Sequence, residues 1–578
     1  MLHQSTYFYR AASAYFLVAL LLLTCCFPAG AQAPVWQSAR AVATATAMAT
    51  DRYSKVTASA LDAAGNVYLA GSFTNSVELG GTTLTSLGNT DVFVAKYDPT
   101  SHQFVWAQRA GGLAYDVATA LVVIGNSVYV AGNFQYYASF GATTLTTTGQ
   151  QDMFVAKLTD AGPTGSFVWA QQAGGTGVER ATGLAVNGTS VYLAGNFDGP
   201  SASFGAIALT NTTTGRDDGF VAKLTDAGST SSFVWAQQTG GAGSELVYAL
   251  AVNGANVYVT GDFDGPSASF GAATLTNTSR AQQDVFVAKL TDAGPTGSFV
   301  WAQRAGGMGG ESANSLAVSG NNVYIAGYFH SPTASFGVNT LATAGFLDGF
   351  VAKLTDAGPT GSFVWAQRAG GTYNDIVNTV TVSGNNVYVA GGYSSITASF
   401  GATTLTNVYS NGVNYDVFVA KLTDAGPTGS FVWAQGAGSE DSEEAYGLAV
   451  SGNNVYVTGA FNGFRTGFGA ITLLNPYYTI VSPVGFLATL TDHILTATAA
   501  GRAPTPVQLF PNPARQSATL RLAPGTTPSP LSLTDAQGRI VRRYPAPTRP
   551  EATLSLWGLP AGLYLLRGAG PAQRLVVE

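Results

Sequence analysis

The chain has 578 residues, more than one hydrophobic core usually organises, so several domains or a repeat array are expected. Only 10% of the residues are charged, the formal net charge is −6, and lysine and arginine are scattered singly, which argues against nucleic-acid binding. The 70 glycines, with many β-branched and aromatic residues, are typical of an all-β protein with tight turns and not of a disordered chain.

The N-terminus has the three parts of a secretory signal peptide. Arg10 precedes an apolar run from Ala11 to Leu23, and the small residues Ala29 and Ala31 form a cleavage site. We predict a signal peptide over residues 1–31. The apolar run is shorter than the roughly 20 residues of a membrane-spanning helix, and no other segment approaches that length, so the mature chain should contain no transmembrane helix.

Both cysteines, Cys25 and Cys26, lie within this predicted signal peptide. We therefore expect no disulfide and no cysteine-based metal site in the mature chain. Cleavage as a lipoprotein at one of these cysteines is the alternative, but Thr24 stands where a small residue is preferred.

A repeated unit fills the chain from Pro34 to about Leu490. The segment Lys421–Gln435 (KLTDAGPTGSFVWAQ) recurs letter for letter three more times, and a fifth copy, Lys223–Gln237, has STSS in place of PTGS. Steps of 63 to 70 residues separate the tryptophans of the VWAQ element, which are Trp36, Trp106, Trp169, Trp235, Trp301, Trp365 and Trp433. This spacing predicts seven copies of one supersecondary unit, each burying its apolar face against its neighbours.

Each unit is predicted to contain four short antiparallel strands. In one copy these are Asn314–Ser319, Val323–Tyr328, Gly349–Leu354 and Ser362–Gln367, with a Gly-Asn-Asn turn between the first two. A longer segment, Ala334–Leu341 in this copy, contains ASFG and a Thr-Leu pair and separates the second strand from the third.

The two ends of the array indicate how it closes. The last unit has no VWAQ element after its third strand, whereas Val35-Trp36-Gln37 stands alone ahead of the first unit. An N-terminal strand that completes the last sheet predicts a closed seven-bladed β-propeller over residues 32–493. An open solenoid, which would need polar caps at both ends, is the alternative.

The repeated tryptophans are expected to pack between neighbouring sheets, and a ring of exposed, sugar-stacking tryptophans is the alternative. The aspartate and lysine of the DVFVAKL strand, such as Asp91 and Lys96, are interpreted as turn-capping and edge-protecting groups.

Residues 494–506 are small and proline-containing, which predicts a linker. Residues 507–578 contain seven short apolar stretches and are predicted to form a separate small β-sandwich.

Two parts of the chain resemble known families. The repeated unit, with its G-N-x-V-Y-x-x-G hairpin, D-x-F-V-A-K strand and closing tryptophan, resembles the bacterial β-propeller repeat (SBBP-like) of surface and secreted proteins. That resemblance implies a propeller but no agreed activity.

The C-terminal segment resembles the type A sorting domain of the type IX secretion system of Bacteroidetes, an immunoglobulin-like β-sandwich. Its F-P-N-P, D-x-x-G-R and L-x-x-G-x-Y motifs supply Pro511, Asn512, Pro513, Gly538, Gly562 and Tyr564. The resemblance implies passage through the periplasm and across the outer membrane by the type IX secretion machinery, and a cell-surface or secreted location.

We assign no catalytic, cofactor-binding or metal-binding residue from the sequence. The four histidines share no motif, and the Asp-containing segment Gly261–Gly265 lacks the spaced ligands of a calcium loop. The acidic run Glu440–Glu444 is interpreted as a solvated loop, with a cation or basic-partner site as the alternative.

The sequence therefore predicts an exported binding or adhesion scaffold for a glycan or protein ligand, and not an enzyme. Loops after the second strand, such as Tyr409–Tyr415, would carry specificity. A carbohydrate-active enzyme using the propeller channel and a surface-layer component are the alternatives. The scaffold predicts a channel walled by Ala, Val, Ser and Thr, whereas the enzyme predicts polar or acidic groups at one mouth.

Overall fold

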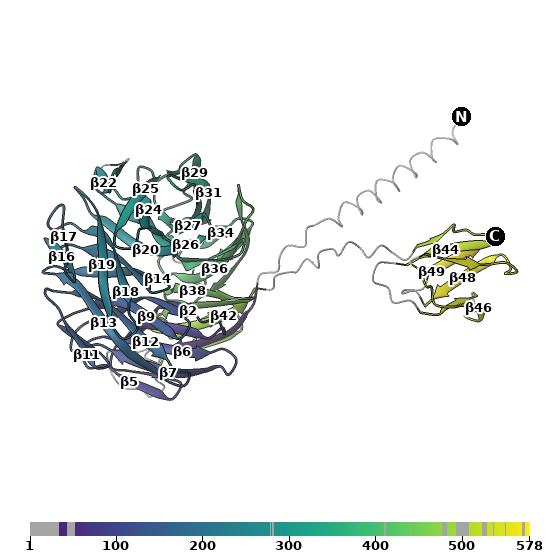
Figure 1. Ribbon diagram of the computed structural model, residues 1–578, viewed down its shortest axis with the longest axis horizontal. Helices are drawn as coiled ribbons and strands as arrows, with labels where there is room; N and C mark the ends of the chain where they lie inside the picture. The colour runs from purple at the N-terminus through teal and green to yellow at the C-terminus, as the bar shows by residue number, and fades with distance from the viewer. Residues whose placement is uncertain are drawn as a thin grey trace. The chain divides into compact units, whose positions relative to one another are not determined.

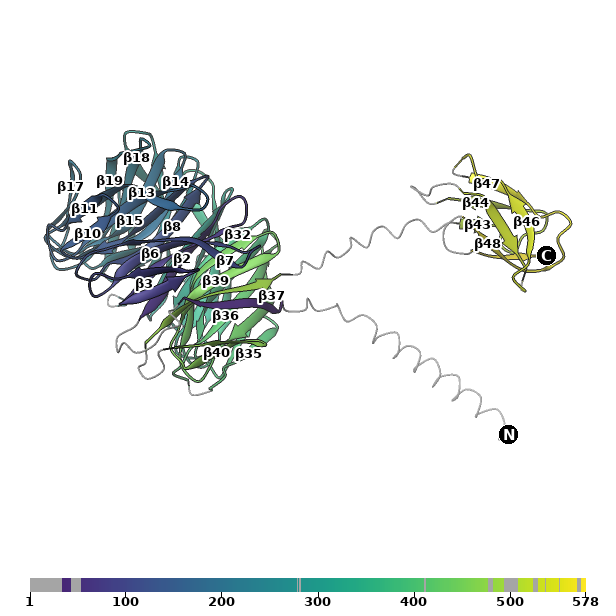
Figure 2. The same ribbon diagram turned by 90° about the horizontal axis from the view of Figure 1, so that it is seen from below.

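The computed structural model describes residues 34–42, 53–277, 279, 282–409, 412–476, 482–492, 508–522, 529–535, 537–549, 551–568 and 573–578. The predicted signal peptide, with Ala29 and Ala31, and the predicted linker lie outside these residues. The described chain contains 49 strands and no helix, so the predicted all-β class is confirmed. It divides into two compact units, the first ending at Asp492 and the second beginning at His493 (Figures 1 and 2).

The first compact unit contains seven sets of four antiparallel strands, which we number as repeats one to seven. Four of these sets are extended by a short hairpin to six-stranded sheets. In repeat five the order is β26 (Glu311–Ser319), β27 (Asn322–Phe329), β30 (Asp348–Asp356) and β31 (Gly361–Gly370). The middle strands β27 and β30 are buried along nearly their whole length. Burial on both faces explains why they are continuous apolar runs and do not alternate.

The corresponding strands of repeats one to three are β2 (Ser54–Leu61), β3 (Val67–Phe73), β6 (Asp91–Asp98) and β7 (Gln103–Ala110); β8 (Val117–Ile124), β9 (Ser127–Phe134), β12 (Asp152–Asp160) and β13 (Gly165–Gly175); and β14 (Glu179–Asn187), β15 (Ser190–Phe197), β18 (Asp218–Asp226) and β19 (Ser231–Gly241). Those of repeats four, six and seven are β20 (Glu245–Asn253), β21 (Asn256–Phe263), β24 (Asp284–Asp292) and β25 (Gly297–Gly306); β32 (Asp375–Ser383), β33 (Asn386–Tyr393), β36 (Asp416–Asp424) and β37 (Gly429–Ala437); and β38 (Glu443–Ser451), β39 (Asn454–Phe461), β42 (Val484–Thr491) and β1 (Trp36–Val42).

Each repeat also contains a short hairpin, within the segment predicted only to separate the second strand from the third. In repeat five it is β28 (Thr333–Phe336) and β29 (Asn339–Ala342), joined through Gly337 at φ +62°. Strand β28 pairs with the outer strand β25 of repeat four, and the hairpins of repeats three, four and six pair with the preceding repeat in the same way. The hairpins of repeats two and seven each make one isolated bridge to the repeat before them. The other hairpins are β4 (Ser76–Leu79) with β5 (Thr82–Thr85), β10 (Tyr137–Phe140) with β11 (Thr143–Thr146), β16 (Ser201–Phe204) with β17 (Ile207–Thr210), β22 (Ser267–Phe270) with β23 (Ala273–Thr276), β34 (Thr397–Phe400) with β35 (Thr403–Thr406), and β40 (Arg465–Phe468) with β41 (Ile471–Leu474).

The first strands of the repeats lie against one another in chain order, and β2 contacts both β8 and β38. The purple first repeat accordingly lies beside the green last repeat in Figures 1 and 2. The N-terminal strand β1 pairs antiparallel with β42 in the sheet β1-β42-β39-β38, as predicted.

A buried aspartate joins each repeat to its predecessor. At the end of β30, Asp356 accepts hydrogen bonds from Lys289 Nζ at 2.6 Å, the Tyr258 hydroxyl at 2.6 Å and Trp301 Nε1 at 3.1 Å, all three from repeat four. Burial would raise the pKa of Asp356, but the bonds from the lysine and the tyrosine hold it below its usual value. We call Asp356 and its equivalents the junction aspartates.

Six junctions share this arrangement. The lysine and junction aspartate pairs are Lys96 with Asp160, Lys157 with Asp226, Lys223 with Asp292, Lys289 with Asp356, Lys353 with Asp424, and Lys421 with Asp492. The tryptophans that complete them are Trp106, Trp169, Trp235, Trp301, Trp365 and Trp433. These tryptophans are buried between neighbouring sheets, as predicted. The interpretation of the lysines as edge-protecting groups is wrong, because they lie on inner strands with buried ammonium groups.

The seventh junction, between repeats seven and one, which we call the seam, has a different construction. Thr489 stands in place of the lysine and Pro99 in place of the junction aspartate. Ser54 makes contacts there that the other junctions lack: its hydroxyl donates to Val42 O at 2.5 Å and accepts from Gly485 N at 3.0 Å.

Trp36 does not occupy the tryptophan position of the other repeats. It pairs with Leu490, which is the register that Phe363 has with Leu354, while Ser38 takes the tryptophan register. Its ring accordingly contacts Phe468 edge-on at 5.0 Å, and its Nε1 donates to Gly436 O at 3.0 Å. The alignment of Trp36 with the other six tryptophans is therefore wrong by one position in the strand register. At this seam Pro99 stands in place of the junction aspartate, so that position offers no carboxylate to accept an indole N–H.

The second compact unit has two antiparallel sheets around one hydrophobic cluster. Its strands are β43 (Gln508–Phe510), β44 (Ser517–Arg521), β45 (Leu531–Thr534), β46 (Ile540–Tyr544), β47 (Glu551–Ser555), β48 (Gly562–Arg567) and β49 (Gln573–Val577), in the orders β43-β44-β47 and β46-β45-β48-β49. These seven strands coincide closely with the seven short apolar stretches of residues 507–578.

We predict that Asp356→Ala lowers the free energy of unfolding by about 3–5 kcal/mol, because it leaves the buried Lys289 ammonium unpaired. Chemical denaturation measures the change. Pro99→Ala, at the equivalent position of the seam, is the matched control and should stay within about 0.5 kcal/mol of the wild type. Equal effects of the two substitutions would contradict the assigned role of the aspartate.

Candidate functional site

All seven first strands contribute residues to one cavity of about 240 Å³, which we call the central cavity. Each of these strands contains one β-bulge, and the bulged residue lines the cavity. The bulged residues are Thr57, Thr119, Thr182, Tyr248, Asn314, Asn378 and Tyr446. A bulge re-aims one side chain, so the same irregularity in every repeat brings seven polar groups to one place.

The bulged residues also connect neighbouring repeats. Thr57 Oγ1 donates to Ala118 O at 2.7 Å, and Thr182 Oγ1 donates to Val247 O at 2.8 Å. Asn314 Nδ2 makes the same kind of bond to Val377 O at 3.1 Å. The rest of the wall consists of small and aliphatic residues, namely Ala58, Ser59, Ala120, Leu121, Gly183, Leu184, Ala249, Leu250, Ser315, Leu316, Thr379, Gly447 and Leu448. No Asp, Glu, Lys or Arg is among the cavity-lining residues of the described chain.

A buried carboxyl group, that of Asp262, contacts one of the two tyrosines that line the central cavity. Asp262 is 3% exposed and is hydrogen-bonded to Tyr248 and to Ser312. Burial raises the pKa of Asp262 to about 7, although both hydrogen bonds oppose the shift. Burial and the neighbouring Asp262 raise the pKa of Tyr248 as well.

The second cavity tyrosine, Tyr446, borders a side pocket of about 210 Å³ at the seam. The Lys55 ammonium lies 3.6 Å from the centre of the Tyr446 ring, a cation–π contact. Burial lowers the pKa of Lys55, and the nearby Glu444 partly offsets that effect.

A second set of acidic residues is buried between repeats, close to where the first strands begin. The backbone N–H of Glu179 donates to the carbonyl of Gln151, which places Glu179 beside Asp152 of the preceding repeat. Six such junction carboxyl pairs occur among the described residues: Asp91 with Asp116, Asp152 with Glu179, Asp218 with Glu245, Asp284 with Glu311, Asp348 with Asp375, and Asp416 with Glu443. Each of these residues is at most 1% exposed.

Glycines make room for the junction carboxyl pairs. A Cβ at Gly174 would lie 2.3 Å from the Asp152 carboxyl carbon, so only glycine fits there. Three of the pairs also receive an arginine, as Arg304 Nη1 donates to Asp284 at 2.8 Å, whereas Gln172 takes this position beside Asp152.

Burial and the facing carboxylate raise the pKa of the second member of most pairs. The pKa rises to about 7 for Asp116 and Glu179, to about 6 for Asp375, and to about 9 for Glu245 and Glu443. Glu245 and Glu443 therefore remain protonated in the folded protein near neutral pH.

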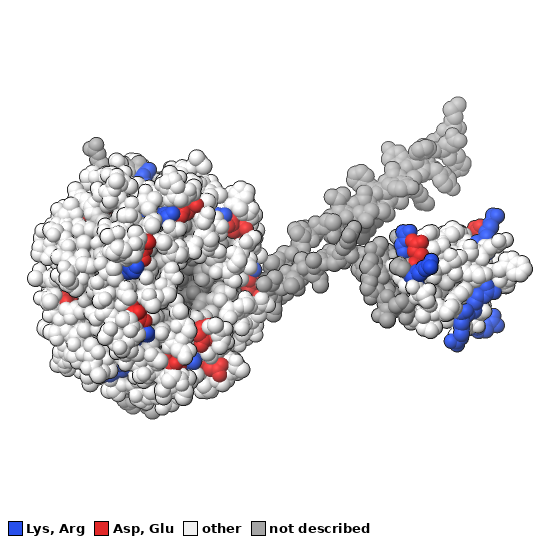
Figure 3. All heavy atoms as spheres, viewed as in Figure 1, with Lys and Arg blue, Asp and Glu red and all other residues white. Residues whose placement is uncertain are grey.

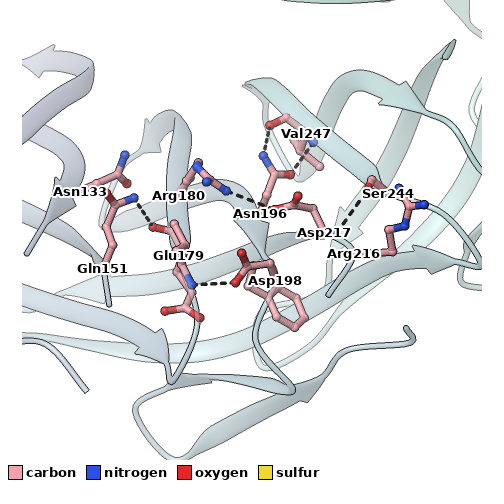
Figure 4. Close-up of polar contacts among 12 residues, drawn as sticks. Asn133, Gln151, Glu179, Arg180, Asn196, Asp198, Arg216, Asp217, Ser244 and Val247 are labelled. Atoms are coloured by element: carbon pink, nitrogen blue, oxygen red, sulfur yellow. Dashed lines mark hydrogen bonds and ion pairs between the residues drawn. The ribbon is translucent and has the colours of Figure 1, made fainter. Parts of the chain in front are cut away.

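Figure 4 shows the surroundings of Glu179 in repeats two to four. Asp198 accepts a hydrogen bond from Val178 N at 2.7 Å, directly beside Glu179. Arg180 reaches Asp217 of the same repeat at 3.3 Å. Asp198 and Asp264 both cap backbone N–H groups.

The acidic run of repeat seven is divided by its structure. Glu443 is buried and accepts bonds from Ser439, whereas Glu440 and Asp441 are exposed. These two residues line a groove of about 540 Å³ together with Val408 and Phe464. The interpretation as a solvated loop thus holds for only part of the run.

The motif residues of the second unit have structural positions. Asp535 accepts from Arg539 Nε at 2.8 Å across a turn in which Gly538 has φ +81°. Asn512 bonds to both Arg574 O and Val576 N and so holds the Pro511–Pro513 segment against β49. Tyr564 is buried and donates to Pro560 O at 2.7 Å, and Gly562 begins β48.

No sequence profile of a protein family matches the chain. Half of the chain, 299 residues, is 26% identical to the regulatory protein FlaEY of Caulobacter vibrioides, and the match spans 30% of that protein's length. A crystal structure of a protein of unknown function from Dyadobacter fermentans aligns over 80% of this chain and 99% of its own, with a TM-score of 0.36 and 10% identity.

No three His, Cys, Asp or Glu side chains among the described residues are grouped closely enough to hold a metal ion. Within the same residues, no helix is long and apolar enough to cross a membrane.

We predict that the first compact unit loses stability as the pH rises. Because the folded pKa values are raised, the contribution is complete below the ordinary carboxyl pKa, 4.5 for Glu, and is lost by about pH 9. Thermal unfolding between about pH 5 and pH 9 measures the decline.

Glu245→Gln, which mimics the protonated acid, should raise the melting temperature at pH 9 and flatten this dependence. Glu78→Gln, on an exposed residue, is the control and should leave the pH profile unchanged. An identical profile for Glu245→Gln would show that the junction carboxyl pairs do not cause the pH dependence.

Proposed function

We propose that the seven repeats form a closed seven-bladed β-propeller that acts as an exported binding scaffold. The pairing of β1 with β42 and the contact of β2 with β38 support closure, since an open array would leave these strands apart. The central cavity carries the functional part of the proposal. Its seven bulged residues are of three types, although the repeats around them are nearly identical.

The cavity suits an uncharged, hydroxyl-rich ligand such as a glycan. The hydroxyl and amide oxygens of the bulged threonines and asparagines offer acceptors, because most of these side chains already donate to a neighbouring repeat, and Tyr248 and Tyr446 supply aromatic surfaces. Ala, Ser, Thr and Leu make up most of the remaining lining, and such small and aliphatic side chains support the scaffold proposal. Protein adhesion through the outer loops is the other form of the same function, and the exposed Val408, Tyr409 and Val413 favour it.

The second compact unit is proposed to be a type IX sorting domain of the immunoglobulin-like kind. Each of its three motifs has a structural position. The D-x-x-G-R motif forms a capped turn, the L-x-x-G-x-Y motif contains the start of β48, and the F-P-N-P motif is bonded to β49 through Asn512. The proposed partner is the type IX secretion machinery, and the proposed location is the cell surface or the medium, reached through the periplasm.

One observation favours a second function, a carbohydrate-active enzyme. The pKa of Asp262, raised to about 7, and its hydrogen bond to Tyr248 are typical of a general acid or base. However, Asp262 is buried and lies behind the tyrosine, so the binding scaffold remains the leading proposal.

Glycan screening of the whole chain, followed by calorimetric titration of each hit, tests the binding site. Tyr248→Ala and Tyr446→Ala are each expected to weaken binding roughly tenfold, or about 1.4 kcal/mol. Tyr136→Ala, which removes a tyrosine that is 73% exposed on the outer hairpin, is the matched control. Unchanged affinity in both cavity variants would exclude the central cavity, and hydrolysis of a hit would favour the enzyme.

Removal of residues 493–578 is expected to trap the protein in the periplasm of a host with a type IX system. Cell fractionation measures the distribution, and the melting temperature of the remaining unit checks that it is folded. Undiminished export of the shortened chain would argue against the sorting role.

A further inference from the structure

The two compact units carry opposite net charges. Residues 493–578 contain nine arginines, no lysine and three acidic residues, a formal net charge of +6. Residues 32–492 contain 16 basic and 29 acidic residues, a formal net charge of −13. Such an asymmetry between parts of one chain points to an anionic partner for the basic part.

Ion pairs account for three of these arginines. Arg515 pairs with Glu578, Arg521 with Glu551 and Arg539 with Asp535, which uses all three acidic residues of the unit. Among the described residues, Arg543, Arg567 and Arg574 make no ion pair with an acidic side chain. In Figure 3 the second unit likewise shows blue atoms beside red ones, and one separate group of blue atoms with no red nearby.

Strand register places these three arginines on one face of the sheet β46-β45-β48-β49. Arg543 and Arg567 both lie opposite Ser532, one on each side of it. Arg574 lies opposite Leu565, two residues before Arg567 on β48. Directly opposed residues, and residues two apart on a strand, point to the same face.

This face is turned away from the core. Tyr564 and Leu566, which alternate with the residues of the face along β48, are buried in the hydrophobic cluster of the unit. All three arginines are exposed. Leu563, 40% exposed, lies on the same face, and Val541, 38% exposed, lies beside Arg543 on the edge strand. We call these five residues the arginine face.

We propose that the arginine face docks on the phosphate-bearing headgroups of an anionic lipid membrane. Guanidinium groups match phosphate geometry in a bidentate way and are more weakly hydrated than ammonium groups, so arginine suits this contact better than lysine. The exposed Leu563 and Val541 would enter the headgroup region beside the arginines, as apolar side chains do at membrane surfaces. A flat sheet face suits an extended surface better than a small anion.

Sedimentation of the whole chain with lipid vesicles tests the proposal. Binding is expected to vesicles containing about 30% phosphatidylglycerol and not to phosphatidylcholine alone, and it should weaken at about 0.5 M salt. Arg543→Gln/Arg567→Gln/Arg574→Gln should reduce partitioning roughly tenfold or more. The matched control, Arg515→Gln/Arg521→Gln/Arg539→Gln, removes the same charge elsewhere in the unit and should bind nearly as the wild type does.

Thermal unfolding checks the fold of both triple variants, and Arg543→Gln on the edge strand is the variant to use if a triple variant fails to fold. Arg543→Gln alone should reduce partitioning to the vesicles, but by less than the triple variant does. Equal losses in the two triple variants, or binding to neutral vesicles, would overturn the proposal. Salt-sensitive self-association that depends on the arginine face, without vesicle binding, would show instead that the face meets the acidic unit of a second copy.

Discussion

The structure of the first compact unit depends on one buried aspartate at each of six junctions. The carboxylate of Asp356 and its equivalents accepts bonds from a lysine, a tyrosine and a tryptophan that lie on three different strands of the preceding repeat. Any other offset between the two sheets would leave an ammonium group and a carboxylate buried without partners. A buried ion pair adds little net stability compared with apolar residues, but a broken one costs several kcal/mol, so the aspartate chiefly fixes the register between repeats.

The seam between repeats seven and one has no junction aspartate, so other contacts must fix the register between these two repeats. Pro99 and Thr489 replace the junction aspartate and the lysine, and Ser54 and Val484 replace the members of a junction carboxyl pair. Here the N-terminal strand itself supplies the connection, because β1 belongs to the last sheet while β2 begins the first. Covalent continuity and the Ser54 bonds hold this junction in place of a junction aspartate and a junction carboxyl pair.

Within each repeat, the strands that form the junctions are nearly constant, whereas the residue that lines the central cavity varies. The second and third strands are buried and nearly the same in every copy. The bulged residue of the first strand, in contrast, is threonine in three repeats, asparagine in two and tyrosine in two. A bulge tolerates such change because the bulged residue has no partner in the strand ladder. The basic second unit is built on other principles, with its paired arginines at turns and edges and its unpaired ones on one sheet face.

The sequence by itself determined the all-β class, the number of repeats, four strands in each, the pairing of the N-terminal strand with the last sheet and the seven strands of the second unit. These features follow from local periodicity, turn residues and exact repetition, which need no knowledge of distant contacts. The recurring Lys-Leu-Thr-Asp segment also held a signal for the junctions, since a lysine and an aspartate at one fixed spacing recur with every repeat.

Only the tertiary structure decided that the lysine of one copy bonds to the aspartate of the next, 64 to 71 residues away. It also decided the shifted register of Trp36, the pairing of four short hairpins with the preceding repeat and the convergence of seven bulged residues. All of these depend on how neighbouring sheets are offset, and a one-residue shift in register changes every partner without changing the pattern of the sequence.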